Sequence, residues 1–252
     1  AGPAGLEAAR VAAERGHSVT LYEKKSSVGG LLEFANNVKG PHENLSVLRS
    51  YFERQMEVLG VNVMLNTEAT ADIIAEASPD IVIAATGGVR DTLGLSDTAG
   101  TKVVGIDDFM MANIAEEVVI VGSNVQAIDA AMYLLAQGKH VQVVTPNAAS
   151  AIGAGHSFWV KTFTQPNMKA LGVRFWPEAT VTAVNDGSVT VKTATGIEQE
   201  IACGTVVEAL DCLPNDSLST GLSCGVVTVG DAARPFNIGE AICSGNAAAR
   251  AI

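Results

Sequence analysis

Cysteine pairs, aromatic residues, basic clusters and long apolar runs are scarce or missing in this sequence. The four cysteines form no CxxC or CxxxxC pair, so we predict neither a redox dithiol nor a cysteine-rich metal site. The four histidines share no metal-ligand spacing, and we therefore predict no metal site of any kind. These residues are Cys203, Cys212, Cys224 and Cys243, and His17, His42, His140 and His156.

The charge balance is acidic, with 27 Asp and Glu against 16 Lys and Arg and a formal net charge of -11. Phosphate backbones are bound by clustered Lys and Arg, so this balance opposes nucleic-acid binding. No apolar run approaches the roughly 18 to 20 residues of a membrane span, and no signal segment is visible. We expect a cytoplasmic protein with small-molecule partners.

What the sequence does contain favours an α/β fold. Its 252 residues are 48% hydrophobic and include 25 glycines, whereas aromatic residues make up only 5%. Small residues let helices pack closely on parallel sheets and let the backbone approach a ligand. The length suits one large domain or two modest ones.

The chain opens on a nucleotide-binding turn, Ala1-Gly2-Pro3-Ala4-Gly5. The residues that follow predict a helix over 6–15 and a strand over 17–23, which together form the later part of a βαβ unit. Such a turn is normally reached from a buried strand, and here neither that strand nor a Met precedes it. We therefore expect the chain to be a fragment of a longer polypeptide.

The turn has the residues that a dinucleotide phosphate site needs. Gly2 allows the backbone to approach a pyrophosphate, Gly5 allows close helix packing, and the helix N-terminus supplies amide donors and partial positive charge. Glu23, about twenty residues on at the end of the next strand, is placed to accept ribose hydroxyls. The glycines of Gly29-Gly30-Leu31-Leu32 follow in a loop that is expected to lie along the pyrophosphate and the remainder of the cofactor.

Two further apolar strands end in candidate ligand contacts. A continuous apolar run over 81–85 leads into Thr86-Gly87-Gly88, where small residues permit tight contact with a ligand. A strand over 226–229 leads into Gly230-Asp231, ahead of a closing helix over 238–252. We also predict helices over 45–59 and 71–77 and a strand over 61–65, and we place Glu33 and Glu43 in loops.

A second βαβ unit repeats the pattern. It consists of a strand over 118–121, Gly122, a helix over 126–137 and a strand over 141–144. Strands over 173–175, 180–184, 188–193 and 198–201 predict a small β-meander, with a hairpin turn at Asn185-Asp186-Gly187. The last strands, over 206–210 and 226–229, are expected to belong to the return of the chain to its first domain.

Three long segments resemble the FAD/NAD(P)-binding region of the NADH:flavin oxidoreductase family, which includes 2,4-dienoyl-CoA reductase, 2-enoate reductase and trimethylamine dehydrogenase. They are AGPAGLEAARVAAERGHSVTLYEKKSSVGG, PDIVIAATGG and VVTVGDAARPFNIGEAICSGNAAARAI. The resemblance implies two Rossmann-like, glutathione-reductase-type domains, the second inserted into the first. The expected ranges are 1–100 and 204–252 for an FAD-binding domain and 101–203 for an NAD(P)-binding-like domain.

The resemblance also implies roles for individual residues. Gly2 and Gly5 match the second and third glycines of the FAD fingerprint, and Glu23 matches the ribose acid. Thr86-Gly87 matches a turn near the flavin nucleotide, and the Gly230-Asp231 carboxylate would hold the ribityl and phosphate region. The predicted FAD-binding residues are Gly2, Pro3, Ala4, Gly5, Glu23, Lys24, Gly30, Leu31, Thr86, Gly87, Gly230, Asp231 and Ile238.

The second fingerprint departs from the family pattern. Where glycine is usual, Asn124 places a side chain at the pyrophosphate position, and Thr145 replaces the acid that would bind a ribose. Gly122 and Ser123 complete the NAD-like set. The sequence therefore leaves NAD(P)H binding open, whereas it predicts FAD binding.

Three functions are compatible with this reading. In the first, FAD relays electrons from NAD(P)H to an N-terminal barrel that carries FMN and a 4Fe-4S cluster, and no side chain is required as a catalytic acid or base. In the second, as in trimethylamine dehydrogenase, the module binds ADP or another nucleotide structurally and its NAD site is vestigial. In the third, the chain resembles a stand-alone ferredoxin or rubredoxin reductase. Assembly into a homo-oligomer is left open.

Overall fold

A computed structural model describes residues 1–40, 43–218 and 222–252, without the side chain of Trp159. His42 therefore lies outside the described residues. The chain divides into two compact units: unit 1 comprises Ala1–Val89 and Cys212–Ile252, and unit 2 comprises Arg90–Asp211. The chain thus leaves unit 1, builds unit 2 and returns. Helices and parallel strands build both units, which confirms the predicted α/β class.

Unit 1 is built mainly of helices around short parallel strands. Its helices are α1 (Pro3–Glu14), α2 (Leu31–Lys39), α3 (Leu45–Val58), α4 (Ala71–Ala77) and α7 (Ile238–Ala251), with a short 3-10 turn η4 (Gly230–Ala232). Its strands are β1 (Thr20–Tyr22), β2 (Asn62–Met64), β3 (Ile81–Ala84) and β14 (Gly225–Thr228). The segments β4 (Val89–Arg90) and β13 (Cys212–Leu213), where the chain passes to and from unit 2, pair with each other.

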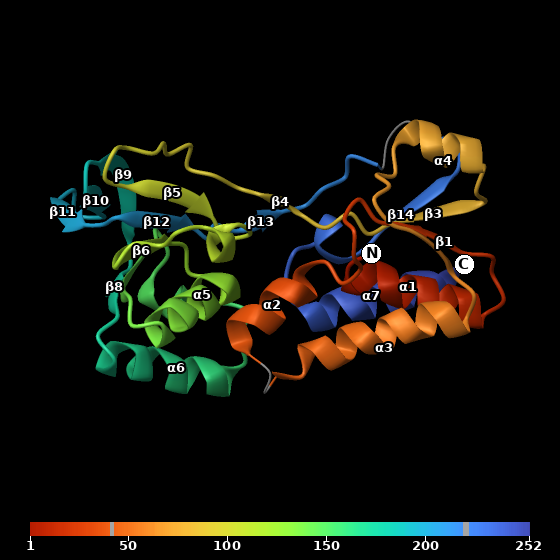
Figure 1. Cartoon of the computed structure of the whole chain (residues 1–252), viewed down its shortest axis with the longest axis horizontal. Coiled ribbons are helices and arrows are strands. Elements are labelled where there is room, and N and C mark those ends of the chain that lie inside the picture. Colours follow the sequence, from red (N-terminus) through yellow and green to blue (C-terminus); the bar gives the residue numbers. More distant parts are fainter. Residues whose placement is uncertain (41–42, 219–221) are drawn as a thin grey trace. The chain divides into compact units, whose positions relative to one another are not determined.

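Helix α1 is the centre of unit 1. Its small residues let it pack against α7 and α3, which run beside it in Figure 1. Leu6 is fully buried among residues of β1, β2 and α3, while Ala4 packs against β3, β14 and α7. Strands β1 and β2 pair in parallel, as do β3 and β14. Helix α1 therefore contacts both strand pairs.

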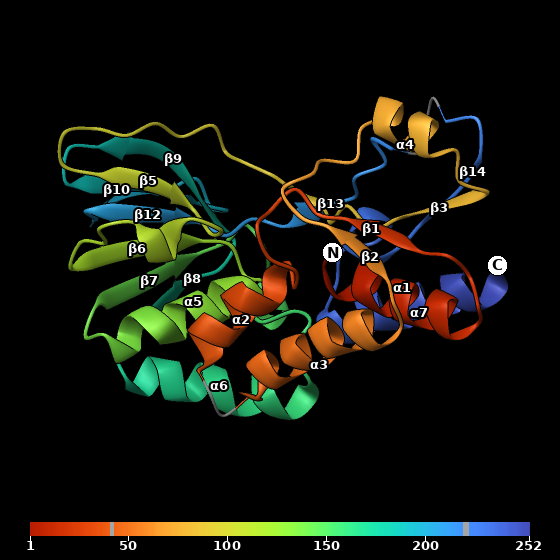
Figure 2. The ribbon, with the colours of Figure 1, turned by 45° about the vertical axis from the view of Figure 1, so that its right-hand side comes forward.

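Unit 2 contains a five-stranded parallel sheet in the order β5-β12-β6-β7-β8, shown side by side in Figure 2. These strands are β5 (Lys102–Gly105), β12 (Thr205–Glu208), β6 (Glu117–Val121), β7 (His140–Val144) and β8 (Arg174–Trp176). A three-stranded antiparallel meander consists of β9 (Ala179–Asn185), β10 (Ser188–Thr193) and β11 (Glu198–Ala202). The helices are α5 (Val125–Ala136) and α6 (Phe158–Ala170), with short turns η2 (Phe109–Met111) and η3 (Ala149–Ala151).

The strand β6 shows why unit 2 folds in layers. Val119 and Val121 pack against the meander, and all four valines and isoleucines from Val118 to Val121 are buried. Successive side chains of a strand point to opposite faces, so Val118 and Ile120 face the other side, where α5 packs on β6 and β7. A parallel strand buried on both faces needs such a continuous apolar run.

Four details differ from the predictions. Residues 31–39 form α2, so Glu33 lies in its first turn and not in a loop. Residues 158–170 form α6, a helix that Pro166 and several exposed apolar residues obscure in the sequence. Strand β8 joins the parallel sheet and not the meander.

The fourth difference concerns the return to the first domain. We predicted that it begins near Gly204, but β12 lies between β5 and β6 in the middle of the unit 2 sheet. Unit 1 therefore resumes only at Cys212, and the first crossing falls at residue 89 and not near residue 100. The apolar character of residues 206–210 is the same in either domain, so the sequence could not assign this strand.

Candidate nucleotide site

The N-terminus of α1 has no side-chain cap. Gly2 is the N-cap residue, with an extended backbone (φ -79°, ψ -174°), and Pro3 is the first helical residue. Helix geometry leaves the amides of Ala4 and Gly5 without acceptors inside the helix, and Pro3 has no N–H to satisfy. A Cβ on Gly5 would lie 3.2 Å from the Cβ of Ala85, so glycine permits the close packing that we predicted. The tip of α1 therefore presents amide donors and the positive end of the helix dipole.

A second uncapped helix begins beside the first. The amide of Gly29 donates to the carbonyl of Ala1 at 2.8 Å, which holds the Gly29-Gly30 loop against the turn. Gly30 is the N-cap of α2 with φ 55°, and a Cβ there would lie 3.0 Å from the Cα of Gly2. Leu31, half-buried, starts the helix. Only glycine fits at position 30, and it brings the tips of α1 and α2 together.

The carboxylate of Glu23 faces the adjacent N-termini of α1 and α2. Its Oε2 accepts a hydrogen bond from the nitrogen of Ala1 at 2.7 Å, and its Oε1 accepts one from the amide of Lys25 at 2.9 Å. Burial alone would raise the pKa of Glu23, but the hydrogen bonds from the terminal ammonium of Ala1 and from the amide of Lys25, together with the charge of that ammonium, hold the pKa below its ordinary value. Glu23 is thus an anion with acceptor capacity to spare, whereas its neighbour Lys24 is exposed.

The carboxyl ends of β3 and β14 form the other side of the candidate site. The two strands run in parallel, so Thr86-Gly87 and Gly230-Asp231 follow them at the same sheet edge. A Cβ on Gly88 would lie 3.4 Å from the carbonyl oxygen of Asp231, which shows how closely the two turns approach. Thr86 is exposed, and Gly87 has φ 75°.

Gly230 connects this edge with the tip of α1. A Cβ on Gly230 would lie 2.7 Å from the Cβ of Ala4, and the Gly230 amide donates to Ser244 Oγ at 2.9 Å. Asp231 Oδ1 accepts a hydrogen bond from the amide of Phe236 at 3.3 Å. Ile238, half-buried, is the first residue of α7. The structure therefore brings the predicted residues of unit 1 to the tips of α1 and α2 and to the adjoining ends of β3 and β14.

The corresponding turn of unit 2 is organised differently. Gly122 follows β6 with φ 141°, and a Cβ there would lie 2.1 Å from the carbonyl oxygen of Ala209, so the turn presses on the end of β12. Asn124 is the N-cap of α5, and its Oδ1 accepts a hydrogen bond from the amide of Ala127 at 3.0 Å. Its Nδ2 donates to the carbonyls of Ala209 and Leu210 at 3.0 and 3.1 Å.

In unit 2, the position at which an acidic residue would bind a ribose is buried. Thr145 is 0% exposed, and its hydroxyl accepts a hydrogen bond from the amide of Asn147 at 3.2 Å. Ser123 is also buried, and its hydroxyl accepts from Asn147 Nδ2 at 3.0 Å. Neither side chain is available to a ligand.

The two units thus differ in their fit to a dinucleotide. In unit 1, uncapped helix tips, a cradle that a Cβ at Gly30 would fill and an anionic Glu23 fit the diphosphate and ribose of an ADP group. In unit 2, a side-chain cap fills the helix tip and a buried hydroxyl replaces the acid. The residues of unit 2 do not fit a nicotinamide dinucleotide bound in this way.

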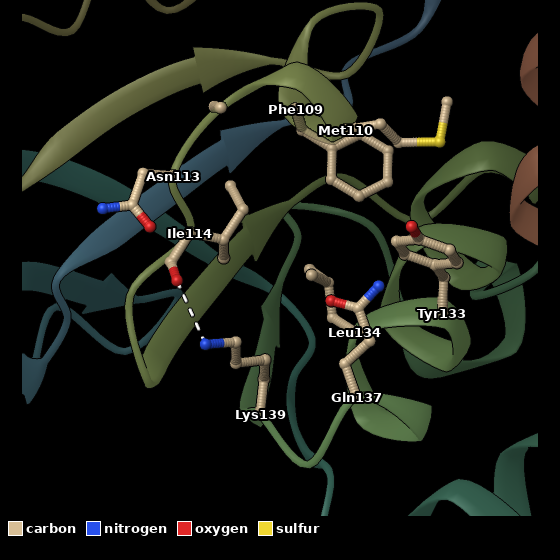
Figure 3. A pocket seen from close by; sticks show the side chains of 9 residues that line it. Phe109, Met110, Asn113, Ile114, Tyr133, Leu134, Gln137 and Lys139 are labelled. Carbon is tan, nitrogen blue, oxygen red and sulfur yellow. Dashed lines mark hydrogen bonds between the residues drawn. The ribbon is translucent and has the colours of Figure 1, made fainter.

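A pocket of about 290 Å³ lies in unit 2, between η2 and the C-terminal end of α5 (Figure 3). It was not predicted from the sequence. Lys139 Nζ donates to the carbonyl of Ile114 at 3.1 Å at one edge of it. The pocket residue Tyr133 lies nine residues beyond Asn124, roughly 14 Å along the helix axis. The pocket is therefore separate from the turn at Gly122. It is lined by Phe109, Met110, Ala112, Asn113, Ile114, Tyr133, Leu134, Gln137 and Lys139.

Other site types find no support in the described part of the chain. There, no group of three or more His, Cys, Asp or Glu residues is placed to hold a metal ion. No disulfide joins the four cysteines, and burial raises the pKa of the Cys203 thiol to about 11, which makes it a poor nucleophile. Among the described helices, none has both the length and the apolar character of a membrane span.

Comparisons with known proteins agree with this geometry. The chain is 37% identical over 149 residues to an NADH oxidase of Thermoanaerobacter brockii, a match that covers 57% of this chain and 23% of that protein. It is 37% identical over 145 residues to a cinnamate reductase of Clostridium sporogenes, covering 57% and 21%. The matched part of the chain thus spans less than a quarter of the length of either relative.

Among solved structures, a 2-naphthoyl-CoA reductase in complex with 2-naphthoyl-CoA superimposes with a TM-score of 0.85 at 32% identity, covering 98% of this chain and 38% of that one. The family model described as pyridine nucleotide-disulphide oxidoreductase matches residues 1–232. The chain therefore belongs to the pyridine nucleotide-disulphide oxidoreductase family. Within that family it corresponds to the FAD/NAD-binding region of the NADH:flavin oxidoreductase group, which its sequence resembles.

Proposed function

We propose that this chain is a flavoprotein oxidoreductase module in which unit 1 holds FAD by its ADP half. The observation that carries the proposal is the contact between two uncapped helix tips at Gly2 and Gly30, with the Glu23 carboxylate facing them. Amide donors and the positive ends of two helix dipoles favour a diphosphate, and a carboxylate favours ribose hydroxyls.

Most of the predicted residues have a part in this arrangement. Ala4 and Gly5 of α1 and the Gly30-Leu31 start of α2 present the backbone donors, while Glu23 accepts from the ribose. Thr86-Gly87 and Gly230-Asp231 lie where the remainder of the cofactor would continue along the sheet edge, with Asp231 as the anionic acceptor. Bound FAD supplies the redox chemistry, since its isoalloxazine ring accepts a hydride and releases electrons singly. The protein orients the cofactor and needs no side-chain acid or base.

The electron acceptor in this proposal is an N-terminal barrel of the same polypeptide, with FMN and a 4Fe-4S cluster. Its support is that the curated and solved relatives are much longer than this chain. The names of the relatives point to reductive chemistry on small organic molecules. The lack of disulfides among the four cysteines agrees with a cytoplasmic location.

Flavin binding by the 252-residue chain tests the proposal. After incubation with FAD and gel filtration, we expect flavin absorbance to elute with the protein, and ADP to compete for the site. Protein that elutes free of flavin and is not affected by ADP would refute the proposal for this chain.

A matched pair of glycine variants makes the test specific to the site. Gly30→Ala and Gly60→Ala both place a side chain on backbone with positive φ (55° and 68°), but a Cβ at position 60 meets nothing within 4 Å. We expect Gly30→Ala to lose FAD and Gly60→Ala to retain it. Equal losses in both variants would indicate general destabilisation and not a cradle at Gly30.

A second candidate function is favoured by the Asn124 cap and the buried Thr145. In it, the module binds a nucleotide in unit 1 and receives no electrons from NAD(P)H through unit 2. Anaerobic titration of the flavin-loaded protein with NADH and with NADPH separates the two functions. Bleaching of the flavin supports the NAD(P)H-dependent oxidoreductase, and an unchanged flavin spectrum supports the second candidate.

A further inference from the structure

The tip of α5 is occupied by the chain's own polar groups. Asn124 spans the space between the first turn of α5 and the end of β12, accepting from Ala127 on one side and donating to Ala209 and Leu210 on the other. In a dinucleotide fold this is where the diphosphate lies against the glycine turn. The side-chain amide of Asn124 makes several hydrogen bonds at this point. It therefore occupies the space in which a diphosphate would contact the backbone amides of the turn.

A carboxylate lies beside this amide. Asn124 Nδ2 also donates to Asp211 Oδ1 at 3.2 Å, which places a negative charge at the positive end of the α5 dipole. An incoming diphosphate would meet a like charge where it normally meets only amide donors. By contrast, no side chain caps the tip of α1.

A loop closes over the same turn. The amide of Gly153 donates to the carbonyl of Ser123, and Asn124 pairs as an isolated bridge with Ala154. A Cβ on Gly155 would lie 2.7 Å from a methyl group of Val125, so the loop backbone lies against the first residue of α5. Residues 152–156 thus cover the turn that carries Asn124.

We propose that Asn124 and Asp211 act as an internal substitute for a diphosphate: they join β12 to α5 and exclude nicotinamide dinucleotides from unit 2. This inference rests on the proposed flavin site of unit 1 and on the second candidate function, in which unit 2 passes no electrons from NAD(P)H. It makes the two side chains determinants of cofactor specificity, and it implies that the exclusion is reversible by substitution.

The test uses ADP-ribose, a redox-inactive probe with the same diphosphate, and the full chain with excess FAD to occupy unit 1. Isothermal titration compares the unchanged protein with Asn124→Gly, Asp211→Asn and the double variant. Glycine is a tolerated N-cap, so the helix should persist without the side chain. We expect no heat of binding for the unchanged protein, and affinity at least about tenfold higher for the double variant than for either single variant.

Thermal unfolding with and without ADP-ribose gives a second readout, since a ligand that binds only the folded state raises the midpoint. The double variant should be less stable alone and should be stabilised by ADP-ribose. Thr70→Gly removes a comparable N-cap, that of α4, where Thr70 Oγ1 accepts from Ile73 at 3.3 Å, and should gain no affinity for ADP-ribose.

Two results would overturn the inference. One is binding of ADP-ribose by the unchanged protein as tight as by the double variant. The other is a folded double variant, by circular dichroism, with no gain in affinity or midpoint. FAD retention by the unchanged protein tests the proposed function separately. A failure of the proposed function can therefore be distinguished from a failure of the inference about Asn124 and Asp211.

Discussion

Glu23 and Thr145 follow equivalent strands in the two units, and their surroundings decide what each can do. Glu23 is an anion whose oxygens face the tips of α1 and α2, whereas Thr145 is fully buried and bonded to a neighbouring amide. A carboxylate with unused lone pairs can accept ribose hydroxyls, and a buried hydroxyl cannot. In the function proposed above, the same fold position favours a nucleotide in unit 1 and opposes one in unit 2.

The first prediction concerns the charge of Glu23. Glu23→Gln keeps the shape of the side chain but removes the charge-assisted hydrogen bonds to a ribose, each of which contributes roughly 1.5–3 kcal/mol. We expect FAD affinity to fall roughly 10- to 100-fold. Quenching of flavin fluorescence during titration measures it. Glu76→Gln, at an exposed position of α4, is the control, and an effect as large as that of Glu23→Gln would contradict a specific role.

Some of these residues could be predicted from sequence and others could not. Gly2, Gly5 and Glu23 are specified by local spacing, because a turn, a helix and a strand fix their relative positions. Asn124 is also a local signal, since Asn is a preferred N-cap. Asp211 is far from Asn124 along the chain, and only the central position of β12 brings the two together.

Between elements, the packing of α7 on α1 positions the candidate site. A Cβ on Gly245 would lie 2.1 Å from the carbonyl oxygen of Ala4, and Gly230 touches the side chain of the same alanine. The tip of α1 and the Gly230-Asp231 turn are thus adjusted to each other through Ala4. A displacement of α7 would change both sides of the site.

The second prediction follows from this contact. Gly245→Ala forces α7 away from α1, because the new methyl group meets backbone, and overpacking of this kind costs about 3 kcal/mol or less in most proteins. We expect lower stability in urea, followed by circular dichroism, and weaker FAD binding. Gly239→Ala lies in the same helix, where a Cβ makes an ordinary contact at 3.4 Å, and should lose neither property.

A hydrogen bond from Asn246 of α7 to an ion pair within α1 also joins these helices. Glu7, 6% exposed, bonds to Arg10 through both carboxylate oxygens and accepts from Asn246 of α7 at 2.6 Å. Burial alone would raise the pKa of Glu7, but the hydrogen bonds from Arg10 and Asn246 hold it below its ordinary value of 4.5. Its contribution to stability is therefore complete above pH 4.5 and is lost as the pH falls through the lower folded-state pKa.

The third prediction is the pH dependence that this network gives. Glu7→Gln should lower the free energy of unfolding at pH 7 by roughly 1–3 kcal/mol, and the difference from the unchanged protein should shrink as the pH falls below 4.5. Urea unfolding across this range measures it. Glu14→Gln removes only an exposed partner of Arg10 and should change stability by less than about 1 kcal/mol. A pH-independent difference for Glu7→Gln would contradict the argument.

Several elements could not be predicted from their own residues. Helix α2 begins at Gly30 in a left-handed conformation, and two consecutive glycines are more typical of a loop. Helix α6 contains Pro166 and leaves Phe158 and Phe163 exposed, so it lacks the clear apolar stripe of an amphipathic helix. Long regular segments such as α1, α3 and α7 had that stripe and were predicted within a few residues.

For the molecule as a whole, the fourth prediction is that FAD protects one unit only. Hydrogen exchange with and without FAD should slow in the segments 2–8 and 28–34, where the two helix tips lie, and remain unchanged over 122–130. The reason is that amides bonded to a ligand exchange slowly, whereas the tip of α5 is already bonded to its own chain. Ligand-dependent protection over 122–130 would show that unit 2 takes part in binding FAD.

The two segments that connect unit 1 with unit 2 lie next to each other. The outgoing and returning chains pair as β4 and β13, and the amide of Asp91 donates to the carbonyl of Asp211 at 3.3 Å. Unit 2 is therefore an insertion whose two ends lie side by side. If residues 90–211 were deleted and residue 89 were joined to residue 212 by a short turn, the helices of unit 1 would keep their sequences and their order.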